Sequence, residues 1–226
     1  MKRKIGCLHA HYSNIEYIQK AIASNDLELV HFVDPGLMSR IASDETFDLT
    51  KAQNKVNDQI EWIASTKVDA ILITCTNYIA LLDDEQLKTS VPIIKIDEPF
   101  FHYVCSITEP QVLLFTNPAT VEGTMRRLNE FATTHVKPIN IDVQIIENTF
   151  ELIMQGKKEQ YVNELSNYIK GLLISNQNKI VSVAQLSMVE TAEKIECEMD
   201  VKIGNPLNTL VTHIESSLQG LFNGEL

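Results

Sequence analysis

The chain has 226 residues, 44% of them hydrophobic and 22% charged, a length that fits one large domain or two small ones. A net charge of −11 with a pI near 5.0 argues against a nucleic-acid partner and against binding to an anionic membrane. No apolar run approaches the length of a membrane span, and the one near the basic N-terminus is too short for a signal peptide. We therefore expect a cytoplasmic protein with four free thiols, far apart and without a CxxC pair: Cys7, Cys75, Cys105 and Cys197.

The first half of the chain alternates predicted strands with predicted helices. Short apolar runs predict strands at 4–9, 27–33, 70–74 and 91–96. Apolar residues at helical spacing predict helices at 14–24 and 49–65, and a further apolar helical segment follows Cys75 directly. Trp62, on the second of these helices, is expected in the core.

The second half repeats this alternation. Strands are predicted at 111–115, 139–145, 179–184 and 201–203. Helices are predicted at 118–134, from 185–188 onward and at 206–221, and two helical segments cover 149–174. Cys105 is expected in a helix and Cys197 in a late turn. Strands that alternate with helices predict an α/β protein whose parallel sheets carry helices on both faces.

The two halves can be laid over each other. Ile15 lies 60 residues before Cys75, and Val121 lies 64 residues before Gln185. We therefore predict two similar α/β domains related by internal pseudo-symmetry, with strand ends that line a shared cleft. Residues 1–104 form the first domain, which carries Cys75, and residues 105–205 form the second, which carries Gln185.

Cys75 occupies the position at which open α/β sheets bind ligands, the carboxyl end of a strand where a helix begins. Free backbone N–H groups and a partial positive charge at the helix N-terminus favour a bound carboxylate and a lowered cysteine pKa. Thr76 and Asn77 add side-chain donors beside the thiol. The alternative is an inert cysteine buried in a sheet.

Other polar residues follow predicted strands. His9 and His11 end the first strand, and Asp97 follows the fourth, where each can face a ligand or bind loop backbone. Three donor side chains lie between the fifth strand and its helix: Thr116, Asn117 and Thr120. They can bind an anion or cap the helix.

Metal and nucleotide cofactors find little support in the sequence. The His9–His11 pair resembles a metal-binding pair, but no third ligand is apparent in sequence, so no metal is predicted. There is no GxGxxG and no GxxxxGK[ST], which leaves nucleotide cofactors without support.

The order of several motifs resembles the aspartate/glutamate/hydantoin racemase superfamily, in its branch of racemase-like proteins. They are IGCLHAHYSNIEYI, DAILITCTNY, VPIIKIDEPF, LLFTNPATVEGTMRRL and VAQLSM, and together they span nearly the whole chain. The resemblance implies two flavodoxin-like domains that meet at a cleft, where one cysteine from each moves a proton at an α-carbon without a cofactor. It also implies that Cys75 is the first of these cysteines, with Thr76 and Asn77 as carboxylate-binding neighbours. It further implies that the C-terminal helix at 206–221 returns to pack on the first domain, so that residues 206–226 belong to that domain together with 1–104.

The sequence departs from that family at one decisive position. The second family cysteine is replaced by Gln185, which cannot act as an acid or a base. Gln185 and Ser187 can only donate or accept hydrogen bonds to the second carboxylate oxygen of a substrate. Our first candidate for the missing acid or base is His11, because histidine titrates near neutrality.

We therefore predict a cofactor-independent racemase or isomerase that acts at the α-carbon of a small carboxylate or amino acid, with Cys75 as acid/base. The resemblance also implies a homodimer. Three alternatives stay open at this point: a one-cysteine decarboxylase, a cis–trans isomerase in which Cys75 is a nucleophile, and a protein that binds a small acid without turning it over.

Overall fold

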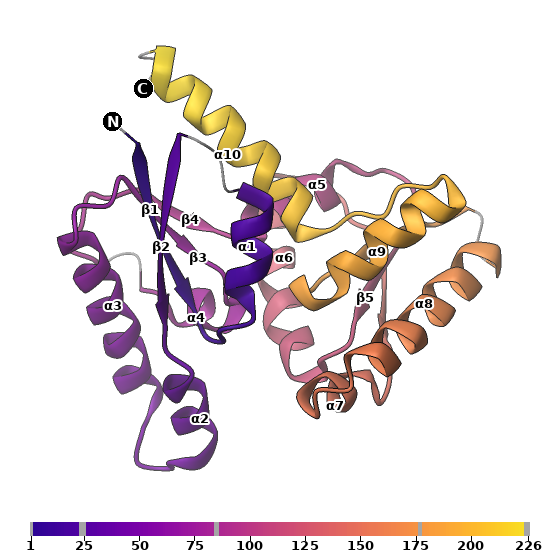
Figure 1. Ribbon diagram of the computed structural model, residues 1–226, viewed down its shortest axis with the longest axis horizontal. Coiled ribbons are helices and arrows are strands. Elements are labelled where there is room, and N and C mark those ends of the chain that lie inside the picture. The colour runs from indigo at the N-terminus through magenta and orange to yellow at the C-terminus, as the bar shows by residue number, and fades with distance from the viewer. Residues whose placement is uncertain (1, 23–25, 84–85, 176–177, 224–226) are drawn as a thin grey trace. The chain divides into compact units, whose positions relative to one another are not determined.

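The computed structural model describes residues 2–22, 26–83, 86–175 and 178–223, with side chains as far as Ser216. The chain divides into two compact units, Met1–Glu98 and Pro99–Leu226, each built around one parallel sheet (Figure 1). The predicted α/β class with two parallel-sheet domains is therefore confirmed. Within the described residues, no helix combines the length and apolar character needed to cross a membrane.

The sheet of the first unit has the strand order β2-β1-β3-β4, with every pair parallel. Its strands are β1 (Arg3–His9), β2 (Leu27–Val33), β3 (Ala70–Ile73) and β4 (Ile93–Lys95). The central strands β1 and β3 are apolar and largely buried, as expected where helices cover both faces of a parallel sheet. Their carboxyl ends lie at one edge, where the polar residues of the site follow.

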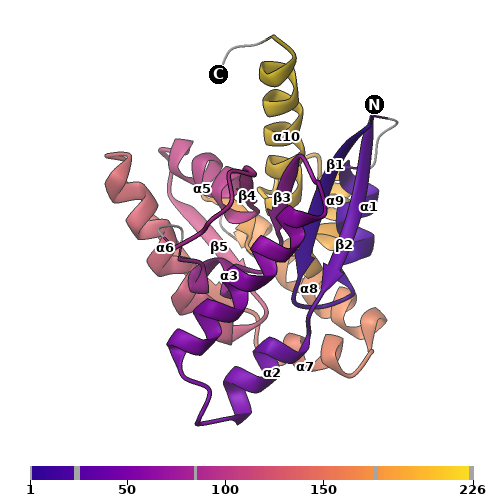
Figure 2. The same cartoon turned by 90° about the vertical axis from the view of Figure 1, so that its left-hand side faces the viewer.

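Helices flank this sheet on both sides. They are α1 (Asn14–Ile22), α2 (Gly36–Ser43), α3 (Leu49–Ser65) and α4 (Thr76–Leu81). α1 and α3 lie on opposite sides of the sheet (Figure 1, Figure 2). Gly6 on β1 permits the close approach of α3, since a Cβ there would lie 2.5 Å from a methyl carbon of Ile63. The side chain of Trp62 on α3 is 67% exposed, so its prediction as core was wrong.

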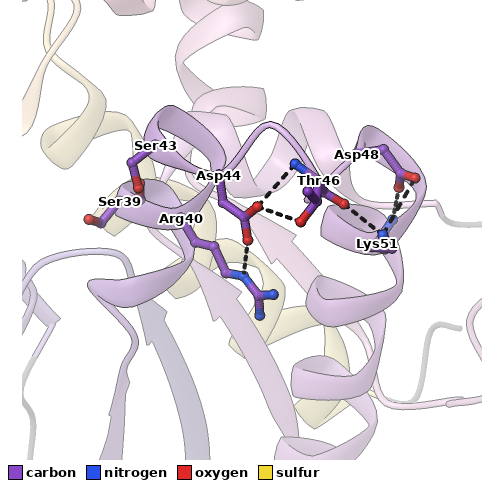
Figure 3. Close-up of polar contacts among 7 residues, drawn as sticks. All are labelled: Ser39, Arg40, Ser43, Asp44, Thr46, Asp48 and Lys51. Carbon is purple, nitrogen blue, oxygen red and sulfur yellow. Dashed lines mark hydrogen bonds and ion pairs between the residues drawn. The ribbon is translucent and has the colours of Figure 1, made fainter.

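The turn between α2 and α3 is held by polar contacts (Figure 3). Asp44 accepts hydrogen bonds from the Nε–H of Arg40 at 3.1 Å and from the backbone N–H of Thr46 at 3.0 Å. Asp48 caps α3 by accepting from the backbone N–H of Lys51 at 2.9 Å. This turn fixes the start of the helix that covers one face of the sheet.

The sheet of the second unit has the order β6-β5-β7, with β5 (Gln111–Phe115), β6 (Ile141–Ile145) and β7 (Ile180–Val183). No fourth strand is assigned among the described residues. Residues 201–203 were predicted as a strand, but they form none, so that prediction was wrong. The next residue, Gly204, makes an isolated parallel bridge with Ser182. The position of this bridge matches that of β4, and the two sheets therefore share one topology, as the predicted duplication requires.

The helices of the second unit cover both faces of its sheet. They are α5 (Asp97–Ser106), α6 (Val121–Thr134) after the short 3₁₀ helix η1 (Pro118–Thr120), α7 (Thr149–Met154), α8 (Lys158–Ser175), α9 (Leu186–Met199) and α10 (Pro206–Asn223). Alternate residues of β5 enter two cores: Val112 and Leu114 pack with α8 and α9, and Leu113 and Phe115 with α5 and α6.

Two sequence predictions differ in detail from this division. Residues 99–104 and 206–226, which the sequence analysis assigned to the first domain, fall within the second unit, where α10 packs against α9. Cys197 lies exposed on α9, not in a turn, because α9 continues to Met199.

Candidate active site

Cys75 lies between β3 and α4 in the first unit. The buried strand AILI ends at Ile73, and Cys75 is the extended residue that precedes the first turn of α4. The backbone N–H groups of Tyr78 and Asn77 interact with its thiol. Thr76 and Asn77 are partly exposed beside it. The thiol and its two polar neighbours are therefore grouped at the carboxyl edge of the sheet, where the sequence predicted them.

The pKa of Cys75 differs from the sequence prediction. Burial raises this pKa above the ordinary value of 9.0, and the nearby charge of Asp97 acts in the same direction. The N–H groups of Tyr78 and Asn77 lower it, but burial is the larger effect. The prediction of a lowered pKa was therefore wrong, and at neutral pH Cys75 is mainly a thiol that can donate a proton.

Asp97 is the predicted residue that the structure brings near Cys75. It follows β4, starts α5 and is only 4% exposed. Its charge raises the pKa of the Cys75 thiol, as a carboxylate does when it opposes the formation of a second negative charge nearby. The pair is arranged to hold a proton at the sulfur.

His9 is completely buried behind Thr74, the residue before Cys75. Its Nδ1 lies 2.8 Å from the hydroxyl of Thr74, and its Nε2 lies 2.9 Å from Nδ1 of His31. Asn14 of α1 donates to the same Thr74 hydroxyl at 3.3 Å. Burial and then His31 lower the pKa of His9 to about 4, so its ring is neutral at physiological pH. Both ring nitrogens are engaged, which leaves neither of them open to a substrate.

His11 lies in the loop after β1 and is exposed. Its Nδ1 accepts from the backbone N–H of Ser13 at 3.2 Å and lies 2.8 Å from the Ser13 hydroxyl, while its ring lies against Tyr12. Among the described residues, its hydrogen bonds thus stay within its own loop. A catalytic role for His11 stays a prediction.

Gln185 holds the position in the second unit that Cys75 holds in the first: each is the second residue after its strand and directly precedes the next helix. Its amide oxygen accepts hydrogen bonds from the backbone N–H of Thr116 at 2.7 Å, the hydroxyl of Thr116 at 2.7 Å and the backbone N–H of Asn117 at 3.1 Å. Its amide nitrogen donates to the hydroxyl of Thr120 at 2.9 Å. The donors expected to bind a substrate anion are therefore occupied by Gln185 itself.

Ser187 makes a contact that the sequence did not indicate. Its hydroxyl lies 3.1 Å from the hydroxyl of Tyr161, a buried residue of α8. This hydrogen bond ties the first turn of α9 to α8. A role of Ser187 in substrate binding stays a prediction.

Sequence reasoning missed Asp34 and Tyr78. Asp34 follows β2, and one of its carboxylate oxygens caps α2 by accepting from the N–H groups of Gly36 and Leu37. Its backbone oxygen accepts from the hydroxyl of Tyr78, the buried residue whose N–H interacts with Cys75. Asp34-Pro35-Gly36 is a typical turn sequence, but only the fold links it to α4.

A cavity of about 660 Å³ also lies in the second unit, among α5, α9, α10 and the loop before α10. Its walls include Tyr103, Glu196, Asn205 and His213. None of the residues that the sequence predicted for the site lines it. The thiol of Cys75 and this cavity are therefore separate features.

No protein-family model and no curated protein matches the sequence, whereas many solved structures match the fold. The aspartate racemase of Picrophilus torridus is 14% identical with a TM-score of 0.66, over 95% of this chain and 94% of that one. A glutamate racemase of Francisella tularensis, in complex with D-glutamate, is 17% identical with a TM-score of 0.63, over 96% and 81%. An allantoin racemase of Klebsiella pneumoniae is 16% identical with a TM-score of 0.67, over 96% and 88%. The chain therefore has the fold shared by aspartate, glutamate and allantoin racemases.

Proposed function

We propose that the protein is a racemase-type enzyme that moves a proton at the α-carbon of a small carboxylic or amino acid from one face, with Cys75 as its acid/base. The observation that carries this proposal is the contrast between two equivalent positions. Cys75 precedes α4 with a titratable thiol, and Gln185 precedes α9 with an amide that is neither an acid nor a base near neutrality.

The substrate class rests on the donors around Cys75 and on the fold. Backbone N–H groups at the start of α4, with the side chains of Thr76 and Asn77, suit a carboxylate held beside the thiol. The similar structures include racemases of aspartate, glutamate and allantoin. A small acid with an acidic α-hydrogen fits both observations.

In this proposal, Cys75 removes a proton from the α-carbon of the substrate and returns a proton to the same carbon. A thiolate form of Cys75 removes the α-proton, the electron pair of the C–H bond moves into the carboxylate as an enolate, and the thiol returns a proton to the same carbon. Two-base racemisation needs a second acid on the opposite face. Gln185 cannot supply it, and its amide is held by three donors from Thr116 and Asn117.

The test is hydrogen–deuterium exchange in D₂O, followed by NMR, over D- and L-aspartate, D- and L-glutamate, substituted malonates and maleate. The wild type is compared with Cys75→Ser, and Cys197→Ser is the matched control because its thiol is exposed on α9. We expect deuterium at the α-carbon of one enantiomer only, with configuration retained. The signal should disappear in Cys75→Ser and persist in Cys197→Ser.

The other outcomes have different meanings. Exchange in both enantiomers means that a second group replaces the missing thiol, and His11 is then the first residue to substitute. Exchange that survives in Cys75→Ser contradicts the proposal. If no compound exchanges or turns over and each only binds, the protein is a small-acid binding protein and not an enzyme.

A second candidate is decarboxylation of a malonate-type acid, which needs only one protonation. The raised pKa of Cys75 favours it, since the thiol form that predominates at neutral pH is the form that protonates a carbanion. The substituted malonates of the same panel test it. Carbon dioxide release with one deuterium in the product, lost in Cys75→Ser, distinguishes it from exchange without turnover.

A further inference from the structure

Three residues with metal-ligand side chains meet on one face of the first sheet. Cys7 and His9 are two residues apart on β1 and therefore point to the same side. The parallel register of β1 and β2 places His31 directly beside Cys7. One ligand atom of each residue lies within 4.8 Å of the ligand atoms of the other two.

We propose that Cys7, His9 and His31 form a binding site for a thiophilic divalent cation, for which Zn²⁺ is the best fit. Thiolate and imidazole ligands together select Zn²⁺ over Mg²⁺ or Ca²⁺, which prefer oxygen. Three protein ligands leave the fourth tetrahedral position to water. This site does not depend on the function proposed for Cys75.

The geometry requires only a small adjustment. Ligand atoms around a tetrahedral zinc lie roughly 3.3 to 3.6 Å apart, given zinc–ligand bonds of about 2.0 to 2.3 Å. Nε2 of His9 and Nδ1 of His31 are now 2.9 Å apart, and the sulfur of Cys7 lies within 4.8 Å. Shifts of about 1 Å or less, by side-chain rotation, therefore bring the three atoms to coordinating distance.

The hydrogen bonds around His9 select the correct tautomer for a ligand. The hydroxyl of Thr74 donates to the backbone oxygen of Leu8 at 3.2 Å, so it accepts from the Nδ1–H of His9. This leaves the lone pair on Nε2 of His9, which faces His31. A metal-bound histidine with its other ring N–H fixed by an oxygen is the usual outer-shell arrangement of such sites.

His31 completes the site from the neighbouring strand β2. Nε2 of His31 is buried and has no hydrogen-bond partner among the described residues, so it can carry the ring proton while Nδ1 binds the ion. His31 is partly exposed, which gives an ion a route to the site.

Cys7 is the ligand whose chemistry changes most. Its side chain is completely buried on β1. Its sulfur lies 3.8 Å from the backbone oxygen of Ile5, which is a weak contact. A divalent ion would displace the thiol proton to solvent and hold the sulfur as thiolate, as metal coordination does in structural zinc sites.

The test uses the full-length, tag-free protein, stripped of metal under reducing conditions. Zn²⁺ is titrated in competition with a chromophoric chelator, with Cys7→Ala and His31→Gln as site variants. We expect about one equivalent per chain in the wild type and at least a roughly tenfold loss of affinity in each site variant. Cys75→Ser and Cys197→Ser are matched controls that should bind like the wild type. Circular dichroism checks that each variant is folded.

A cobalt spectrum keeps the test decisive if Cys7→Ala does not fold. Co²⁺ bound by a thiolate gives a charge-transfer band, which should appear in the wild type, Cys75→Ser, Cys105→Ala and Cys197→Ser alike. By elimination this assigns the band to Cys7. The proposal is wrong if the wild type withdraws no metal from the chelator, if folded site variants bind like the wild type, or if Cys75→Ser loses the band.

Discussion

The amide oxygen of Gln185 lies 2.7 Å from both the backbone nitrogen and the hydroxyl oxygen of Thr116, and both donate to it. With Asn117, three donors converge on one oxygen, as they would on the oxygen of a bound anion. The side chain of Gln185 is thus fixed by hydrogen bonds from residues of its own unit. At the position equivalent to Cys75, the side chain of Gln185 therefore occupies the donors that the sequence analysis expected to bind an anion.

The first prediction concerns this contact. Gln185→Ala leaves the donors of the buried Thr116, and of Asn117, without their acceptor, and should lower the free energy of unfolding by about 1–3 kcal/mol. Gln185→Glu keeps an acceptor in place and adds charge-assisted hydrogen bonds, so it should retain most of the stability at neutral pH. Urea unfolding of both variants tests this, with exposed Gln155→Ala as a control within about 0.5 kcal/mol of wild type. Equal losses in Gln185→Ala and Gln155→Ala would contradict it.

The second prediction concerns the thiol of Cys75. Because burial and Asp97 raise its pKa, alkylation of Cys75 by iodoacetamide should accelerate with pH and reach half its maximum above pH 9.0. Asp97→Asn removes the negative charge that opposes the thiolate, so the midpoint should move down. Peptide-resolved mass spectrometry separates Cys75 from the other cysteines. The control is Glu98→Gln, which alters the neighbouring carboxylate that pairs with Lys95 and should leave the midpoint in place. A midpoint near neutrality in the wild type would refute the assignment.

The third prediction compares two glycines of the second unit. A Cβ at Gly204 would lie 2.2 Å from a ring carbon of Tyr103 and 2.5 Å from the hydroxyl of Ser182. Gly204→Ala should therefore lower the free energy of unfolding by about 1–3 kcal/mol, because the bridge to β7 must move. Gly123, inside α6, has open space around it, and Gly123→Ala should stabilise by about 0.5–1 kcal/mol. Thermal unfolding measures both variants. If Gly204→Ala stabilises the protein as Gly123→Ala does, the close contacts around Gly204 do not exclude a side chain there.

Much of the architecture followed from local patterns. AILI before Cys75 and QVLLF before Thr116 are apolar runs that end in polar turn residues, and both form buried strands. The segment at 201–203 resembled a strand, but Gly204 makes only one bridge. Short apolar runs do not reveal how many backbone hydrogen bonds a neighbouring strand can offer.

The sequence predicted where the site residues lie better than it predicted their pKa values and contacts. The place of Cys75 followed from strand and helix order, whereas its raised pKa depends on burial, which no local pattern fixes. His31 could not be linked to Cys7, because the register of two parallel strands is a tertiary property. Likewise, the reach of Gln185 to Thr116 depends on strands β5 and β7 being neighbours.

The last prediction tests whether position 185 limits the chemistry. In the family that the sequence resembles, a thiol from each half acts on one α-carbon, and here only Cys75 is present. Gln185→Cys supplies a second thiol and releases the donors of Thr116 and Asn117, which can then bind a substrate carboxylate. For a substrate that the wild type exchanges with retention, we expect this variant to form the opposite enantiomer with deuterium at the α-carbon. Gln185→Ser, which also releases the donors but adds no acid of suitable pKa, is the matched control and should still exchange with retention. Chiral chromatography with NMR measures both outcomes. The prediction is wrong if the serine variant also forms the opposite enantiomer, or if the cysteine variant does not.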